Sequence, residues 1–203
     1  MPSPATDAPA GSTAPEPTGV PGLTASDPLC AAWAGYVGTV QALGVAASFG
    51  DLTSAQLAGL ELTSAPYVAE VTATIDNSWP DELASERATV IDQRIGPYAR
   101  RASRGGDALV GAGMTTADLS ELRSAWSSAL ARRDPESPVL AVPSVSAQVQ
   151  AKLDAAASAY DSAATPFAQD PSLVVEAVDA PLTDAYLAAH CPDLATSGVG
   201  DAL

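Results

Sequence analysis

The chain has 203 residues and a formal charge of −15, with nine lysines and arginines against 24 aspartates and glutamates. A surface this acidic repels phosphate groups, so we expect neither nucleic acid nor an anionic membrane as a direct partner. Hydrophobic residues make up 47% of the chain and aromatic residues only 5%. Because much of the hydrophobic fraction is alanine, the best helix former, the composition favours close-packed helices over a large sheet.

Residues 1–26 are dominated by proline, alanine, threonine, serine and glycine, and they have no periodic apolar face. Such a segment cannot bury enough apolar surface to offset the entropy lost on ordering. It therefore predicts a disordered tether in front of the folded part. The segment has neither the basic n-region nor the apolar h-region of a secretory signal peptide.

The first helix is predicted to begin at Asp27–Pro28, a good N-cap followed by a residue suited to the first helical position, and to end at Gly50. Apolar residues recur between these points at helical spacing and no charged residue intervenes, so a membrane span is an alternative. Gln41 near the middle, and the lack of any Lys or Arg before Arg87, favour a helix packed inside a domain.

The middle of the chain predicts several shorter helices. A short helix is expected over 53–61, and a second one is capped by Ser64. An amphipathic run over 83–98 follows, with a kink at Gly96–Pro97 and a break at Gly105–Gly106.

Three further helices complete the pattern. They are a helix capped at Thr115 and Thr116 that ends at Arg132–Arg133, a helix from Ser144 to Thr165–Pro166, and a helix from Asp170–Pro171, displaced at Ala180–Pro181, that ends at Cys191–Pro192. The sequence therefore predicts an all-α protein. We expect a single helical bundle of five to seven helices over residues 27–194, with a flexible tail over 195–203.

The only two cysteines are Cys30, in the first turn of the first predicted helix, and Cys191, at the end of the last one. In an antiparallel bundle with an even number of long helices these two ends lie at the same pole, where a disulfide can form. Closing so long a loop stabilises a fold by at most about 5 kcal/mol. The alternative is a pair of buried, reduced thiols in a cytosolic protein. The placement of the pair favours the disulfide, and with it an oxidising compartment.

The general layout carries a resemblance. A Pro/Ala/Thr/Ser-rich segment over 1–26 precedes an alanine-rich helical body that Cys30 and Cys191 bracket. In this layout the chain resembles secreted proteins and lipoproteins of high-GC Gram-positive (actinobacterial) bacteria. The resemblance implies an extracytoplasmic protein, secreted or anchored at the cell surface. Cys30 follows Asp-Pro-Leu, which is not a lipobox, so we expect any lipid anchor to lie upstream of residue 1.

Catalytic and metal-binding patterns depend on the single histidine, His190. A metal site formed with Cys30, Cys191 and Asp193 can be drawn, but adjacent residues on a helix point about 100° apart, so His190 and Cys191 would share an ion only at a distorted helix end. The sequence has no Gly-x-Ser-x-Gly motif, Glu-x-x-His pair, P-loop or dinucleotide fingerprint. We therefore predict no catalytic residue, no metal and no cofactor.

The one local reversal of charge is RIGPYARRASRGG, over 94–106. Its four arginines are Arg94, Arg100, Arg101 and Arg104. They predict a small cationic patch for a carboxylate, a phosphate or the acidic surface of a partner. The alternative is that these arginines pair with aspartates and glutamates of the same chain.

Tryptophan and tyrosine side chains are spread over the predicted helices, and we expect most of them in the core. Because no catalytic constellation is found, we expect a non-enzymatic, surface-tethered helical domain that binds a protein partner in the cell envelope. The alternative is a small-ligand carrier, with an interior pocket lined by Tyr and Trp for an apolar or haem-like molecule. An enzyme built on carboxylates that the sequence does not group is the third hypothesis.

Overall fold

The computed structural model describes residues 19–49, 51–134, 140–170, 173 and 178–195. Most of the predicted tether, residues 135–139, most of the first part of the helix predicted from Asp170–Pro171 and the tail from 196 onward lie outside the described residues. All regular elements among the described residues are helices, which confirms the all-α prediction. They are α1 (Pro28–Phe49), α2 (Ser54–Asn77), η1 (Asp81–Leu83), α3 (Arg87–Thr89), the π-helix η2 (Val90–Ile95), α4 (Gly96–Gly111), α5 (Thr116–Ala131), α6 (Ala147–Ala163), η3 (Phe167–Gln169), α7 (Pro181–His190) and α8 (Pro192–Ala195).

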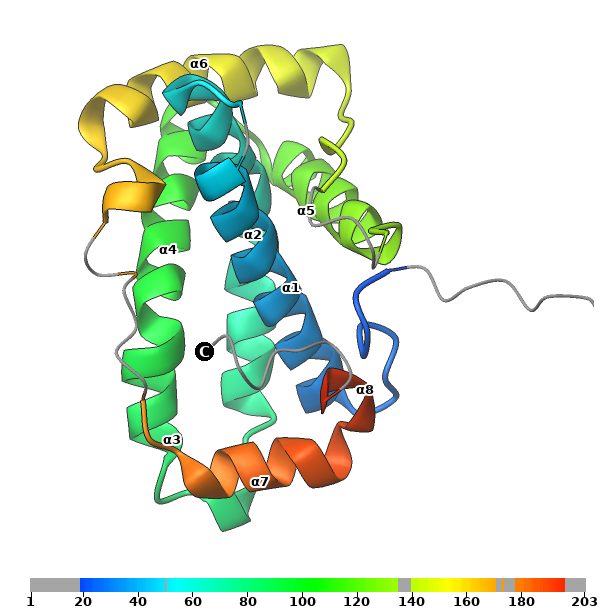
Figure 1. Ribbon diagram of the computed structural model, residues 1–203. Coiled ribbons are helices and arrows are strands. Elements are labelled where there is room, and N and C mark those ends of the chain that lie inside the picture. Colours follow the sequence, from blue (N-terminus) through cyan, green and yellow to red (C-terminus); the bar gives the residue numbers. More distant parts are fainter. Residues whose placement is uncertain (1–18, 50, 135–139, 171–172, 174–177, 196–203) are drawn as a thin grey trace, which may run out of the picture.

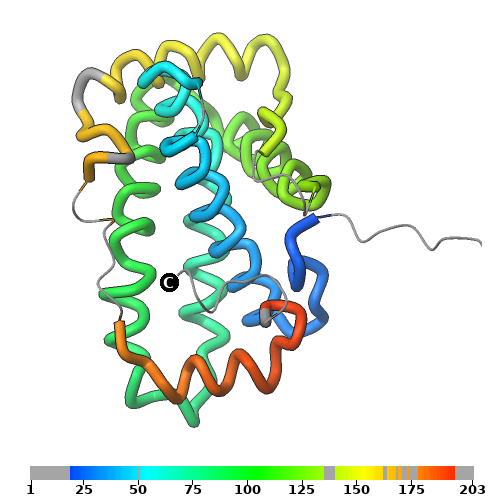
Figure 2. Tube along the Cα trace, in the orientation of Figure 1, coloured from blue at the N-terminus to red at the C-terminus, as the bar shows by residue number. Residues whose placement is uncertain are grey.

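The helices form one bundle around α2, which contacts α1, α4, α5 and α6. Helices α1, α2 and α4 run along the long axis of the bundle, whereas α6 crosses one end and α7 crosses the other (Figure 1). The trace in Figure 2 shows that the start of α1 and the end of α7 lie together at the same end.

The predicted start of α1 is confirmed, since the Asp27 carboxylate accepts a hydrogen bond from the backbone N–H of Cys30 at 3.0 Å. Among the described residues, α1 is the one helix whose length and apolar composition would let it cross a membrane. However, 67% of the residues in the most apolar 18-residue stretch of α1 are buried inside the bundle. Trp33 and Tyr36, both 2% exposed, are part of that buried face. The burial favours a core helix.

The disulfide predicted from the sequence is confirmed. Cys30 and Cys191 are bonded across 161 residues of sequence, with Cα atoms 5.4 Å apart. The bridge is buried, with the two residues 1% and 3% exposed. It closes the described fold into one covalent loop, from the first turn of α1 to the residue after α7.

The two helices predicted over 53–77 are one continuous helix, α2. Thr53 and Gln56 form a capping box at its start. The prediction that Ser64 caps a second helix is wrong, because its hydroxyl donates to the Glu61 carbonyl at 2.7 Å inside the helix. The hydroxyl of Thr63 donates to the Gly59 carbonyl in the same way, also at 2.7 Å. Side-chain oxygens that could cap a helix start are thus used inside the helix.

The kink was predicted at Gly96–Pro97, and this is where the π-helix η2 ends and α4 begins, with Pro97 in the first turn of α4. The break predicted at Gly105–Gly106 is wrong, since α4 continues to Gly111. Gly105 lies where α4 packs on α2, and a Cβ atom there would come within 3.2 Å of the Ala65 Cβ. The glycine therefore permits close helix packing rather than ending the helix.

Residues 19–26, which the composition assigns to the tether, pack onto the bundle. The backbone N–H groups of Gly19 and Val20 donate to the carbonyls of Arg133 and Leu130 at 2.8 and 3.1 Å. The φ angle of Gly19 is +97°, and a Cβ atom there would lie 2.6 Å from the Ala131 carbonyl oxygen. The described fold therefore begins earlier than the composition suggests.

Candidate functional site

The largest concentration of buried charge surrounds Arg101 of α4. Its Nε and Nη2 donate to the two carboxylate oxygens of Glu61, on α2, at 2.7 and 3.1 Å. Its Nη1 donates to the Asp170 carboxylate at 2.7 Å, and Nη2 also donates to the Thr165 carbonyl at 2.9 Å. The side chains of Arg101, Glu61 and Asp170 are 5%, 8% and 9% exposed. One guanidinium thus joins α2, α4 and the segment after α6.

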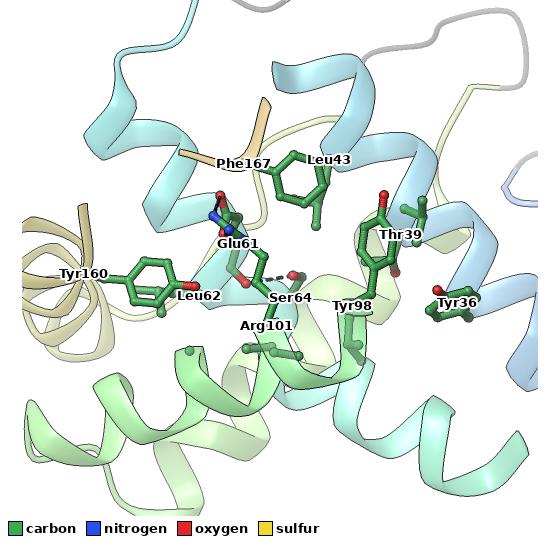
Figure 3. Close-up of a pocket in the computed structure, with 15 residues that line it drawn as sticks. Tyr36, Thr39, Leu43, Glu61, Leu62, Ser64, Tyr98, Arg101, Tyr160 and Phe167 are labelled. Atoms are coloured by element: carbon green, nitrogen blue, oxygen red, sulfur yellow. Dashed lines mark hydrogen bonds and ion pairs between the residues drawn. The ribbon is translucent and has the colours of Figure 1, made fainter. Parts of the chain in front are cut away.

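Local sequence explains how this cluster forms. Glu61 is the only charged residue between Asp51 and Glu70, and it lies on the buried face of α2. Arg101 lies one turn before Gly105 and shares its helix face. The close approach of α4 to α2 at Gly105 therefore brings the guanidinium to the Glu61 carboxylate. Figure 3 shows the Arg101 and Glu61 side chains pointing toward each other.

Aromatic rings extend from this cluster toward α1. The Phe167 ring lies 5.3 Å from the Arg101 guanidinium carbon, a cation–π distance. The Tyr98 ring lies 5.9 Å from Phe167 and 6.1 Å from Tyr36, edge to face with the latter. The Tyr36 hydroxyl donates to the Arg94 carbonyl at 3.1 Å. Burial raises the pKa of Tyr36 and of Tyr98, so both rings stay neutral.

The interior cavity beside these rings has a volume of about 20 Å³. Tyr36, Tyr98, Tyr160 and Phe167 contribute to its walls (Figure 3). Such a volume holds about one water molecule. A haem or another drug-sized ligand does not fit in this cavity. The carrier alternative needs an interior pocket large enough for such a ligand.

The two buried carboxylates raise the question of acid–base chemistry. Burial raises the pKa of Glu61, although the hydrogen bonds and the charge of Arg101 oppose that rise. A catalytic pair needs space for a substrate between its carboxyl groups. Here the Arg101 guanidinium occupies that space and hydrogen-bonds to both Glu61 and Asp170. The geometry is that of an ion-pair bridge between packed segments.

The structure separates the four arginines of the predicted cationic patch. Arg101 and Arg94 are buried, and the Arg94 guanidinium donates to the Asp184 carboxylate and to the Val178 carbonyl, both at 2.8 Å. Arg100 and Arg104 are exposed, and Arg104 lies 3.7 Å from the Asp170 carboxylate. At least Arg94 and Arg101 therefore pair with acidic residues of the same chain, which was the alternative interpretation of this sequence.

His190 lies in the last turn of α7. Its Nδ1 is 3.0 Å from the Tyr186 carbonyl, and its ring stacks on that of Tyr186 at a centroid distance of 4.1 Å. Cys30 and Cys191 are consumed by the disulfide. Within the described part of the chain, no three His, Cys, Asp or Glu side chains lie close enough together to hold a metal.

A second hollow is open to the surface at the α6 end of the bundle, with a volume of about 650 Å³. We call it the apolar groove. It is formed by the end of α1, the start of α2, α6 and residues 140–143, and its lining includes Ala42, Leu60, Leu140 and Leu153. No Tyr or Trp lines it among the described residues. It therefore differs from the aromatic interior pocket expected for a carrier.

Sequence reasoning missed Glu61, Asp170 and the apolar groove. A signal existed for Glu61, because a lone acidic residue on an apolar helix face predicts a buried partner. Asp170 precedes a proline and therefore indicates a helix start, which hides its role in an ion pair. The groove combines residues between 42 and 63 with residues between 140 and 158, so no local pattern could have shown it.

Comparisons of this chain with protein-family models, with curated proteins and with solved structures find no match. Its function therefore has to be inferred from its own geometry.

Proposed function

We propose that this protein is an extracytoplasmic, non-enzymatic helical domain that acts by binding a protein partner in the cell envelope. The observation that carries the proposal is the buried disulfide between Cys30 and Cys191. Most cytosols keep thiols reduced, whereas exported proteins commonly close a modest core with a disulfide. A bridge that joins the first turn of α1 to the residue after α7, at one end of the bundle, favours an oxidising compartment.

Two features support binding over catalysis. The hollow beside the charged cluster at Arg101 has a volume of about 20 Å³, which is room for about one water molecule. The apolar groove, at about 650 Å³, has room for several side chains of another molecule. These two features suit a protein that binds another molecule at its surface better than one that encloses a substrate in an active site.

The location is tested in intact cells of the source organism that produce the full chain with a C-terminal tag. A membrane-permeant maleimide reagent is added before lysis, the cells are fractionated, and the tagged protein is denatured in excess reagent so that any buried thiol is labelled. Half of each sample is then reduced and treated with fresh maleimide, and the masses of both halves are measured. We expect the protein in the envelope or the medium, and we expect it to gain two maleimide groups only after reduction. The double variant Cys30→Ser/Cys191→Ser serves as the control without thiols. Cytosolic protein with both thiols labelled before reduction would overturn the proposal.

A further inference from the structure

We infer that the apolar groove binds the apolar face of a basic amphipathic helix supplied by a protein partner. This inference rests on the proposed function, because it assigns the surface and the chemistry by which the domain would hold its partner. Three properties of the groove carry it: exposed apolar side chains, size and charge.

The exposed apolar side chains are concentrated at the groove. Five large hydrophobic residues are exposed in the described part of the chain, and three of them, Phe49, Leu52 and Val142, line this hollow. Phe49 is 82% exposed and Val142 is 79% exposed. Such a cluster marks an interaction site. Because Phe49 and Val142 are so exposed, a small molecule inside the hollow would leave much of both side chains uncovered. A larger partner fits this observation better.

The size and lining of the groove suit the apolar face of a helix. Its walls come from α1, α2 and α6, and small residues such as Ala46, Gly59 and Ala157 widen it. A helix placed in a groove inserts the large side chains at positions i, i+3, i+4 and i+7 of its apolar face. A hollow of about 650 Å³ provides room for several such side chains.

The charge of the groove selects a basic partner. Asp51 and Asp154 are among its lining residues, and no Lys, Arg or His is among the described ones. The Asp154 carboxylate accepts a hydrogen bond from the Gln150 amide at 2.7 Å, which holds it in place on α6. Lysine or arginine side chains flanking an apolar face would meet these carboxylates. A second copy of this chain, with a formal charge of −15, is a poor complement.

The test uses synthetic peptides about 18 residues, or five helical turns, long. The probe is a fluorescein-labelled amphipathic helix of leucine and lysine. The controls are a scrambled peptide of the same composition and an amphipathic helix of leucine and glutamate. Fluorescence anisotropy with the oxidised full chain at physiological salt should show binding of the leucine–lysine helix. The two controls should bind at least about tenfold more weakly. Equal affinity for the scrambled peptide, or no binding of the helix, overturns the inference.

Matched variants locate the site. Val142→Lys and Asp154→Lys, at the groove, should each weaken binding of the leucine–lysine helix by about tenfold. Val110→Lys and Asp107→Lys make the same changes at exposed residues of α4 and should leave the affinity unchanged. Thermal unfolding of all four variants checks that they fold. Groove variants that bind like the controls overturn the inference.

Analytical sedimentation of the same samples measures the oligomeric state and so tests whether a second copy of this chain occupies the groove. A dimer that Val142→Lys abolishes would assign the groove to a second copy and overturn the inference. If the peptide tests fail while the protein is oxidised and located in the envelope, the groove assignment is wrong but the proposed function stands.

Discussion

The buried hydroxyl of Thr39 links α1 to α5 by accepting a hydrogen bond from the Trp126 indole N–H at 2.9 Å. The same hydroxyl donates to the Gly35 carbonyl at 2.8 Å. Thr39 is 1% exposed and Trp126 is 0% exposed, so the link lies inside the core. A buried polar contact of this kind fixes how two helices pack, because any shift would leave the indole N–H without this acceptor.

Replacing Thr39 by valine keeps the shape of the side chain but removes the acceptor. We expect the free energy of unfolding to fall by about 1–3 kcal/mol, the cost of leaving a buried donor unsatisfied. Thr39→Ser keeps the hydroxyl and loses one methyl group, so the smaller loss of about 1 kcal/mol is expected. Urea unfolding followed by circular dichroism measures both variants. Valine and wild type of equal stability would show that the link contributes nothing.

Arg101 provides a second test of the core. Arg101→Met leaves the buried carboxylates of Glu61 and Asp170 without their shared partner, so we expect a loss of about 3–5 kcal/mol in unfolding free energy. Arg100→Met is the matched control, because Arg100 is the neighbouring residue and is exposed. The control should change stability by less than about 0.5 kcal/mol. Similar urea midpoints for the two variants would contradict a structural role for the Arg101 bridge.

The predictions from sequence succeeded where the signals are local. Asp27 caps α1, and Thr115 with Asp118 forms a capping box at the start of α5; both helix starts were predicted from a few adjacent residues. The two cysteines are far apart in the sequence, but they could be paired because they are the only two and both flank the helical region.

Several of the failures share a physical cause, which is tertiary contact. Gly105 reads locally as a helix breaker but permits the packing of α4 on α2. Arg101 and Glu61 are 40 residues apart, and neither side chain reveals its partner in sequence. The four arginines appear as one patch in the sequence, yet the fold buries Arg101 and leaves Arg100 exposed.

The adjacent glycines of α4 provide a matched pair for this packing argument. A Cβ atom at Gly106 would meet nothing within 4 Å, whereas one at Gly105 would lie 3.2–3.3 Å from Ala65 and Leu62. Gly106→Ala should raise the unfolding free energy by about 0.5–1 kcal/mol, the gain in helix propensity. Gly105→Leu should lower it by about 1–3 kcal/mol, because the added atoms overpack the contact. Chemical unfolding compares the two, and Gly106→Leu controls for the effect of leucine itself. If both leucine variants behave alike, the α2–α4 contact at Gly105 is not tight.

Asp118 makes the fold sensitive to acid. A hydrogen bond from Lys152 at 2.6 Å, together with hydrogen bonds from the backbone and hydroxyl of Thr115, lowers the pKa of Asp118 to about 2. Since this pKa is lower in the folded than in the unfolded chain, the unfolded chain binds more protons between the two values. The stabilisation from Asp118 is therefore complete above about pH 5 and is lost as the pH falls toward 2.

Asp118→Asn removes this titration while keeping a side-chain oxygen that can cap α5. We expect the wild type to be more stable than the variant at neutral pH, and we expect the difference to shrink steadily as the pH falls from about 5 to about 2. Urea unfolding at a series of pH values measures the difference directly, so other groups that titrate in both proteins cancel. Asp92→Asn, at an exposed residue of η2, controls for the loss of one negative charge. A constant difference across this pH range would mean that the interaction with Lys152 does not shift the pKa of Asp118, because only a group that titrates differently in the folded and unfolded chains changes the slope.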